Sequence, residues 1–386
     1  MSTVAPEVVE QVRDRLARDG VALTPRVVAE ALRADGRPVG DSTVLAVHDL
    51  LVRDAIGAGP LEPLLRVDGV TDVLVNGPHE VFIDRGEGLE RTSVAFPDEP
   101  AVRRLAQRLA TAAGRRLDDA TPYVDARLAD GTRFHAVLSP IARPGTLLSL
   151  RVPRRRVFTL DGLVAAGTVS ETGASILARL VESRLAFLVS GGTGTGKTTL
   201  LNALLSVVPV HERVVVVEDS SELRPDHPHI VSLEARPPNV EGAGAIPMQA
   251  LVRQALRMRP DRLVVGEVRG AEVTDLLAAM NTGHEGGCGT IHANSAGDVP
   301  SRIEALAMSA GMPREAAHSQ LSSAIEVVAH LRRDQDGRRR LAQLAVPQID
   351  ERGLVGMKDA IRFPRDGDVQ EDTGADLLAR RLELRS

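Results

Sequence analysis

Eight consecutive residues, Gly191–Thr198 (GGTGTGKT), have the types and spacing of a site that binds a chain of phosphates. They fit the pattern G-x-x-x-x-G-K-[ST], in which glycines let the backbone curl so that several N–H groups converge on phosphate oxygens. Lys197 supplies a compact positive charge for the β- and γ-phosphates, and the Thr198 hydroxyl is suited to bind Mg²⁺. The predicted phosphate-binding residues are Gly191, Gly192, Thr193, Gly194, Thr195, Gly196, Lys197, Thr198 and Thr199.

The sequence on either side of this motif supports the prediction. An apolar run suited to a buried strand, Ala186–Val189, precedes it, and a helix-forming run, Thr199–Leu205, follows it. The free N–H groups and positive dipole at the start of such a helix attract phosphate. A glycine-rich turn that arose by chance is the alternative, and the flanking strand and helix argue against it.

Two glutamates, Glu218 and Glu267, each follow an apolar run typical of a buried strand. Because the carboxyl ends of parallel strands converge on the ligand crevice, both side chains could reach the γ-phosphate. One would hold Mg²⁺ through water, while the other orients or deprotonates the attacking water. Gly266 stands before Glu267, where phosphate-loop proteins usually carry an aspartate. A solvated acid at a strand end remains the alternative interpretation for each glutamate.

The elements that must position these residues lie within 158–363, where apolar runs alternate with helical patterns. This alternation is typical of a parallel sheet with helices on both faces, so the predicted fold class is α/β. The predicted strands are Ala186–Ser190, Val214–Glu218, Arg262–Gly266 and Gly289–His292, and the predicted helices are 198–206, 248–258, 271–282 and 298–310. Lys358 falls in a predicted C-terminal hairpin.

Four further segments complete the predicted organisation. Residues 1–57 form a short helical segment, with one helix starting after Thr24-Pro25. Residues 58–150 form a small α/β domain, because strand patterns pair across turns as hairpins, one of them at Asp130-Gly131, and 102–112 has helical spacing. Residues 151–157 are a basic linker, and 364–386 is a flexible tail in which Leu377, Leu378 and Leu382 could form a short helix.

Composition excludes several classes of protein. The longest stretch without a charged residue is 14 residues, 198–211, which is too short for a spanning helix. The N-terminus lacks the layout of a signal peptide, and one cysteine, Cys288, excludes a disulfide framework and a cysteine-based zinc site. The net charge of −5 and the scarcity of aromatics argue against direct nucleic-acid binding. We therefore expect a cytoplasmic protein without zinc.

Lysine is rare in this chain. Lys and Arg total 47, yet only Lys197 and Lys358 are lysines. A coding bias toward arginine accounts for the imbalance in general. The lysine in the phosphate motif marks a position where a forked guanidinium would be bulkier than an ammonium beside the phosphates.

Beyond the motif, several segments resemble the secretion ATPases that power type II secretion, type IV pili and type IV secretion. Within that superfamily the chain is most similar to the tight-adherence (Flp) pilus assembly ATPases and their TadA-like, conjugal transfer-associated relatives. The resemblance covers about residues 58–363. It rests on Gly59–Leu64 (GPLEPL), Val73–Pro78 (VLVNGP), Val124–Gly131 (VDARLADG), Val217–Leu223 (VEDSSEL), Leu251–Gly270 (LVRQALRMRPDRLVVGEVRG), Met280–His284 (MNTGH) and Thr290–Asn294 (TIHAN).

The resemblance implies a RecA-like domain that binds ATP and Mg²⁺, with roles for particular residues. Glu218 would activate water, and Glu267 would lie near Mg²⁺. His284 and His292 would sense the γ-phosphate. Arg133 and Arg151, from the N-terminal domain, would complete the nucleotide site.

The implied function is a hexameric motor at the inner face of the cytoplasmic membrane. It would assemble with itself and act on polytopic membrane platform proteins, and through them on a pilin or secreted substrate. Two alternatives remain open: a DNA translocase for conjugal transfer, and a scaffold that binds nucleotide without hydrolysing it.

Overall fold

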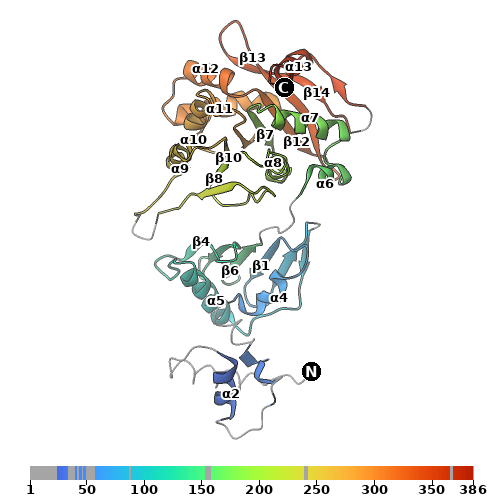
Figure 1. The fold of residues 1–386 in the computed structure, drawn as a ribbon. Helices are drawn as coiled ribbons and strands as arrows, with labels where there is room; N and C mark the ends of the chain where they lie inside the picture. Colours follow the sequence, from blue (N-terminus) through green and yellow to red (C-terminus); the bar gives the residue numbers. More distant parts are fainter. Residues whose placement is uncertain are drawn as a thin grey trace. The chain divides into compact units, whose positions relative to one another are not determined.

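The computed structural model describes residues 24–33, 40, 43–45, 47–48, 57–86, 88–152, 158–238, 242–365 and 368–385. The chain divides into two compact units, Met1–Arg154 and Arg155–Ser386 (Figure 1). Most of the helical segment predicted over 1–57 lies outside the described residues, as do residues 153–157 of the predicted linker.

Near the N-terminus, helix α2 (Pro25–Arg33) confirms the predicted start after Thr24. The Thr24 hydroxyl oxygen accepts a hydrogen bond from the Val27 N–H at 3.4 Å, and proline is favourable in a first turn, where its missing N–H is not needed. The short helices η1 (Gly59–Leu61) and α4 (Glu62–Leu65) follow.

The first unit is built on an antiparallel six-stranded sheet, ordered β3-β2-β1-β6-β5-β4. Both predicted hairpins are confirmed, since Val73 pairs with Ile83 and Ala126 with Phe134. Helix α5 (Glu99–Ala112) packs its buried leucines into the same core. The strands are β1 (Asp72–Asn76), β2 (Val81–Asp84), β3 (Leu89–Arg91), β4 (Tyr123–Arg127), β5 (Arg133–Val137) and β6 (Leu147–Arg151).

The second unit contains a nine-stranded sheet, ordered β15-β14-β13-β12-β7-β11-β10-β8-β9. The strands from β12 to β9 in this order are parallel, and β13, β14 and β15 extend the sheet antiparallel. The strands are β7 (Phe187–Gly191), β8 (Val214–Glu218), β9 (Ile230–Glu234), β10 (Arg262–Val268), β11 (Cys288–His292), β12 (Val327–Arg333), β13 (Arg339–Ile349), β14 (Val355–Arg362) and β15 (Gln370–Glu371).

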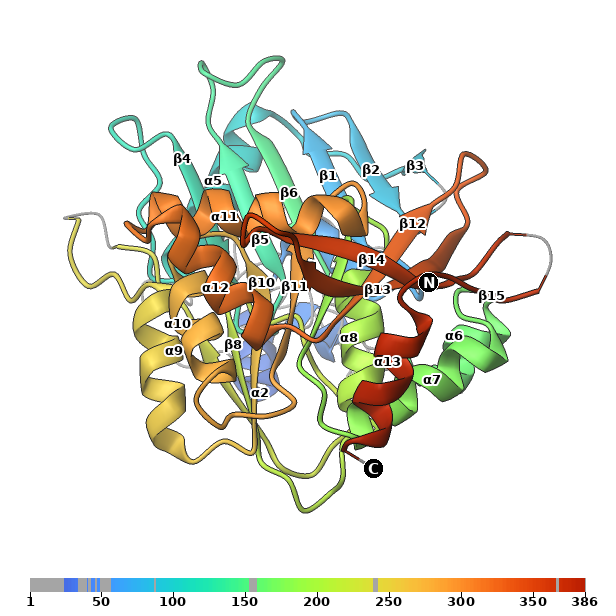
Figure 2. The same ribbon diagram turned by 90° about the horizontal axis from the view of Figure 1, so that it is seen from above.

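Helices cover both faces of this sheet (Figures 1 and 2). Val214 and Val216 join one core with α6 (Leu160–Ala165), α7 (Glu171–Glu182), α8 (Lys197–Leu205) and α13 (Ala375–Glu383). Val215 and Val217 join the other core with α9 (Met248–Ala255), α10 (Glu272–Met280), α11 (Val299–Ser309) and α12 (Arg314–Ala324). Burial on both faces explains why strand β8 is a continuous valine run rather than an alternating one. The remaining short helices are η2 (Leu256–Met258) and η3 (Ala296–Asp298).

The four predicted strands and four predicted helices of this unit are present, with ends shifted by up to three residues. The hairpin predicted around Lys358 is also confirmed, because Lys358 of β14 pairs with Val346 of β13. Several elements, including β9, α6, α7 and α12, were not predicted, since their partly exposed residues give weaker apolar patterns.

The prediction of a flexible tail over 364–386 is wrong. These residues contain strand β15 and helix α13, and Leu378 and Leu382 of that helix are buried in the core that α7 and α8 share. The alternative of a short helix is confirmed. The tail was predicted to be solvated because most of its residues are polar, but Leu378 and Leu382 form an apolar stripe on one side of α13.

Candidate active site

The phosphate motif forms a tight loop between strand β7 and helix α8. Gly191 ends β7, and a Cβ at this position would lie 2.6 Å from the Leu331 carbonyl oxygen and 2.6 Å from the Thr195 hydroxyl oxygen. Gly196, the N-cap of α8, has a φ of 96°, a conformation that favours glycine. The close approach and the left-handed turn explain why glycine is needed at these two positions.

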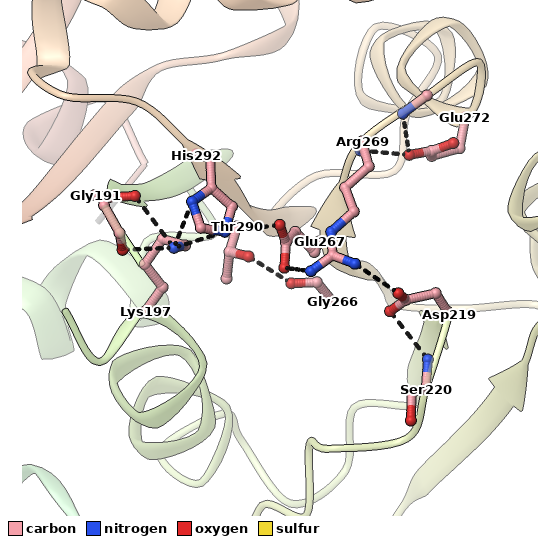
Figure 3. A network of polar contacts seen from close by, with 12 residues as sticks. Gly191, Lys197, Asp219, Ser220, Gly266, Glu267, Arg269, Glu272, Thr290 and His292 are labelled. Atoms are coloured by element: carbon pink, nitrogen blue, oxygen red, sulfur yellow. Dashed lines mark hydrogen bonds and ion pairs between the residues drawn. The ribbon is translucent and has the colours of Figure 1, made fainter. Parts of the chain in front are cut away.

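Lys197, the first residue of α8, is aimed back at the loop (Figure 3). Its Nζ donates hydrogen bonds to the carbonyl oxygens of Gly191 at 3.1 Å and Gly192 at 3.0 Å. The residue is only 7% exposed. Burial lowers the pKa of Lys197 from its usual value, although the nearby Glu267 charge opposes this. A buried ammonium thus lies where the motif predicts it.

His292 stands beside this lysine, because β11 ends at His292 in register with Gly191. Its Nε2 lies 3.2 Å from Lys197 Nζ and 2.9 Å from Glu267 Oε1, and only the first contact has hydrogen-bond geometry. Burial, followed by the charge of Lys197, lowers the pKa of His292, so the neutral ring predominates at neutral pH.

Glu267 is held from one side only. Arg269 Nη2 donates to Glu267 Oε2 at 2.7 Å, and Arg269 Nη1 donates to Asp219 Oδ2 at 2.9 Å. The other carboxylate oxygen, Glu267 Oε1, is buried and accepts no hydrogen bond. The hydrogen bond that Arg269 donates to Glu267 is the main reason that the pKa of Arg269 is raised. The arginine therefore ties together Glu267, near the end of β10, and Asp219, which follows β8.

Glu218, the last residue of β8, is 3% exposed. Its Oε1 accepts hydrogen bonds from the Glu222 and Leu223 N–H groups at 3.0 Å each, whereas Oε2 is buried without a hydrogen-bond partner. Burial raises the pKa of Glu218 to about 7, against the two backbone hydrogen bonds, which lower it. A carboxylate of this kind can exchange a proton near neutral pH.

The glycine that replaces the usual aspartate has a structural reason. A Cβ on Gly266 would lie 2.5 Å from Glu218 Cγ and 3.2 Å from its Cδ. The Glu218 side chain therefore occupies the space that any larger residue at 266 would need. The Thr290 hydroxyl donates to the Gly266 carbonyl oxygen at 2.6 Å and fixes this segment from the β11 side.

These groups fit a nucleotide with Mg²⁺. The loop offers a cradle that a Cβ would fill, and Glu218 Oε2 and Glu267 Oε1 are buried acceptors without hydrogen-bond partners. Thr198 follows Lys197 on α8. Within the described ranges, no three His, Cys, Asp or Glu side chains gather as a metal cage. Mg²⁺ needs no such cage, because substrate phosphates and water supply most of its ligands.

One predicted nucleotide contact, His284, lies elsewhere. It precedes β11, whose far end carries His292, so the strand separates the two histidines by roughly 13 Å or more. The neighbouring Gly286 packs against Arg262 and Arg184, which stand before β10 and β7 at the amino edge of the sheet. The structure therefore does not bring His284 to the phosphate loop. The predicted strand Gly289–His292 already separates the two histidines, and only the family resemblance placed His284 at the nucleotide.

The two predicted arginines, Arg133 and Arg151, belong to the first unit, where they face each other across β5 and β6. Arg151 ends β6, although the sequence assigned it to the linker, and its Nε donates to Asp72 Oδ1 at 3.0 Å. The pairing of Arg269 with Glu267 depends on the fold.

One hollow of the second unit is separate from this chemistry. It has a volume of about 800 Å³ and is lined by residues of α6, α7 and the C-terminal half of α8, among them Leu160, Ala178 and Ala203. Phosphate-binding residues lie at the opposite end of α8. Among the described residues, no helix combines the length and apolar character needed to cross a membrane.

Comparison with known proteins identifies the family to which this sequence is similar. The sequence profile of a family described as "Type II/IV secretion system protein" matches residues 54–362. A Mycobacterium tuberculosis protein named "putative conjugal transfer protein" is 58% identical over 314 residues, covering 80% of this chain and 89% of that protein. Conjugal transfer protein TrbB of Rhizobium radiobacter is 32% identical over 305 residues, covering 77% and 90%.

Solved structures share the fold. The ATPase DotB of Yersinia pseudotuberculosis matches with a TM-score of 0.53 at 16% identity, covering 84% of this chain and 80% of that chain. The pilus retraction motor PilT with bound ADP matches with a TM-score of 0.51 at 17% identity, covering 86% and 85%. At these identities the likeness is one of fold alone.

Proposed function

The chain belongs to the type II/IV secretion system protein family, and we propose that within this family it hydrolyses ATP with Mg²⁺ to power secretion or pilus assembly. The observation that carries the proposal is the grouping of Lys197, Glu218 and Glu267 at one edge of the sheet, beside a loop shaped for phosphates. Two carboxylates with different environments suit two different roles: Glu218 is buried and Glu267 is half-buried.

The chain's own residues divide the work as follows. The N–H groups of 191–197 and Lys197 bind the phosphates, and Thr198 with Glu267, through water, would hold Mg²⁺. When bound, Mg²⁺ neutralises charge that develops on the phosphates. Glu218 accepts a proton from the attacking water, because its pKa of about 7 lets it be free at neutral pH and still basic enough to act. His292, neutral and close to Lys197, completes the phosphate side.

The finer proposal is a homohexameric motor. Arg133 and Arg151 would then complete the nucleotide site, as an arginine supplied across an interface stabilises charge on a transferring phosphoryl group. The motor would act in the cytoplasm at the inner face of the membrane, on a polytopic platform protein, and so extrude a pilin or secrete a substrate. Membership in the family and the names of the relatives support this proposal.

A second candidate, a DNA-transfer translocase, is favoured by the conjugal transfer names of two relatives. The net charge of −5 and the scarcity of aromatic residues argue against it. Hydrolysis measured at modest salt with and without single- and double-stranded DNA separates the candidates. Stimulation by DNA would favour the translocase, and no response would favour the pilus or secretion motor.

The proposed hydrolysis is tested on the only two lysines of the chain. Lys197→Ala should abolish phosphate release, whereas Lys358→Ala, which changes an exposed residue of β14, should leave it unchanged. Phosphate release from Mg·ATP is measured together with the binding of a fluorescent ATP analogue. Wild-type activity in Lys197→Ala would disprove the proposal. Binding by the wild type without any release, even with its membrane partner, would favour a nucleotide-gated scaffold.

A further inference from the structure

A buried histidine that the proposed mechanism does not use lies directly beside the phosphate loop. His330, on strand β12, is 4% exposed, and its Nδ1 lies 2.9 Å from the hydroxyl oxygen of Ser190, which is fully buried. The ring is also close enough to the backbone of Asn294 for that contact to raise the pKa of His330. No sequence motif singled out this residue.

Both partners of His330 border the active site. Ser190 is the residue before Gly191, the start of the phosphate loop, and it pairs with His330 in the sheet. Asn294 comes two residues after His292. Strand β7 stands between β12 and β11 in the sheet, so the His330 ring connects the phosphate loop with the segment that carries His292.

The two contacts determine which nitrogen of the His330 ring carries the proton. The contact with Asn294 raises the pKa of His330, as it does when a ring N–H donates to a carbonyl oxygen. Burial has the larger effect and lowers the pKa, so the ring is neutral and carries one N–H. The other nitrogen, Nδ1, then accepts from the Ser190 hydroxyl. One donor and one acceptor are both needed, which a small apolar residue cannot provide.

We propose that His330 is a positioning residue, which holds the start of the phosphate loop and the His292 segment in register so that Lys197 and His292 stay in contact. The inference rests on the proposed ATP hydrolysis. Loss of the ring removes the partner of the buried Ser190 hydroxyl and the contact with the Asn294 backbone, so the two segments can shift relative to each other. Small misplacements of reacting groups reduce rates strongly.

His318 provides a matched control in the same unit. It is also 4% exposed and also uses both ring nitrogens, since Nε2 lies 2.8 Å from Glu304 Oε2 and Nδ1 accepts from the Val355 N–H at 2.9 Å. Its partners belong to α11 and β14, and neither borders the phosphate loop nor His292. A purely structural role for His330 predicts that the two histidines behave alike.

The test compares His330→Ala, His330→Gln and His318→Ala in the full chain, with Tm, kcat and KM for ATP. Both alanine variants should lower Tm. His330→Ala should lower kcat about tenfold or more with KM within about twofold, whereas His318→Ala should keep kcat within about twofold. His330→Gln should recover most of kcat, because its amide offers one donor and one acceptor.

Three results would overturn the inference: equal kcat in the two alanine variants, an effect confined to KM, or no recovery with glutamine. A wild type that does not hydrolyse ATP would instead refute the proposed function. In that event amide hydrogen exchange still decides about His330. Exchange at 190–196 and 292–294 should be faster in His330→Ala than in His318→Ala, and equal rates would refute the positioning role.

Discussion

The nine-stranded sheet has a buried glutamate at each end of its parallel strands, and the two glutamates differ in their hydrogen-bond partners. We call these two sides the amino edge and the carboxyl edge of the sheet. At the amino edge, Glu212 is 4% exposed and faces Arg262, which is 1% exposed. Arg262 Nε donates to Glu212 Oε2 at 2.6 Å, and Arg184 Nη1 donates to Glu212 Oε1 at 3.3 Å. Both oxygens of Glu212 therefore have cationic partners. At the carboxyl edge, Glu218 is as buried, but one of its oxygens has no hydrogen-bond partner.

The difference separates a structural charge from a reactive one. A buried carboxylate whose two oxygens both face arginines can hold neighbouring segments together, whereas a buried carboxylate without a cation resists ionisation. The pKa of Glu218, raised to about 7, is the mark of the second kind. Such a group lowers the stability of the protein at neutral pH, and it is retained where a proton must be moved.

The largest effect is expected from a substitution of Glu218 at the carboxyl edge. Glu218→Gln should slow phosphate release by about 10²–10⁴-fold, because the amide cannot accept the proton of the attacking water. Glu234→Gln is the control, since Glu234 ends the neighbouring strand β9 and pairs with Glu218 in register. Its rate should stay within about twofold of the wild type. Equal losses in both variants would show that the edge responds to any charge change rather than to loss of a base.

The next largest effect is expected from a substitution of Glu212 at the amino edge. Glu212→Gln removes the partner of a buried arginine and should lower the unfolding free energy of the second unit by about 3–5 kcal/mol. Glu285→Gln, which breaks a more exposed contact with Arg385 at 3.7 Å in the same unit, should cost at most about 1 kcal/mol. Denaturant unfolding of the two variants is the measurement. Similar unfolding midpoints for the two variants would mean that the buried Glu212 pair contributes no more to stability than the exposed Glu285 contact.

A third prediction sharpens the comparison through pH. The unfolded chain loses the Glu218 proton near pH 4.5, and the folded chain loses it near 7, so the folded state binds more protons between these values. The unfolding free energy should therefore fall as pH rises from about 4.5 to 7. At pH 8 the loss amounts to about 3 kcal/mol for a pKa raised from 4.5 to about 7. Denaturant unfolding of Glu218→Gln should lack this part of the pH dependence, and parallel profiles would contradict the assignment.

The smallest effect is expected from a substitution at Gly266, whose missing side chain leaves space for the Glu218 side chain. Gly266→Ala should cost about 1–3 kcal/mol of stability through overpacking, and it should slow phosphate release because the Glu218 side chain must move. In a Glu218→Ala background the same change should be nearly free of cost, since the conflicting Glu218 atoms are gone. A double-mutant cycle with no coupling would show that the two residues do not compete for space.

Much of the site was predictable because its information is local. The phosphate motif fixes a loop between a strand and a helix. Glu218 is the last residue of β8 and Glu267 the second-last residue of β10, and the apolar runs of both strands are unambiguous. Parallel pairing then brings the two glutamates together without any further knowledge of the fold. The family resemblance, noticed from short segments, is confirmed by the match over residues 54–362.

The rest depends on the three-dimensional arrangement. His284 and His292 are eight residues apart, but an intervening strand sends them to opposite edges. The tail became a helix because distant cores bury Leu378 and Leu382. Contacts such as His330 with Ser190 join residues 140 positions apart, and the sequence offers no periodic pattern for them.

The central claim is that the carboxyl edge of this sheet hydrolyses ATP with Glu218 as the base. The most direct test is kcat/KM for phosphate release from Mg·ATP between pH 5.5 and 8.5, which reports groups of the free enzyme. The predicted profile rises with pH and has its midpoint at about 7, where Glu218 loses its proton. A flat profile, or no release of phosphate at any pH, would contradict the account.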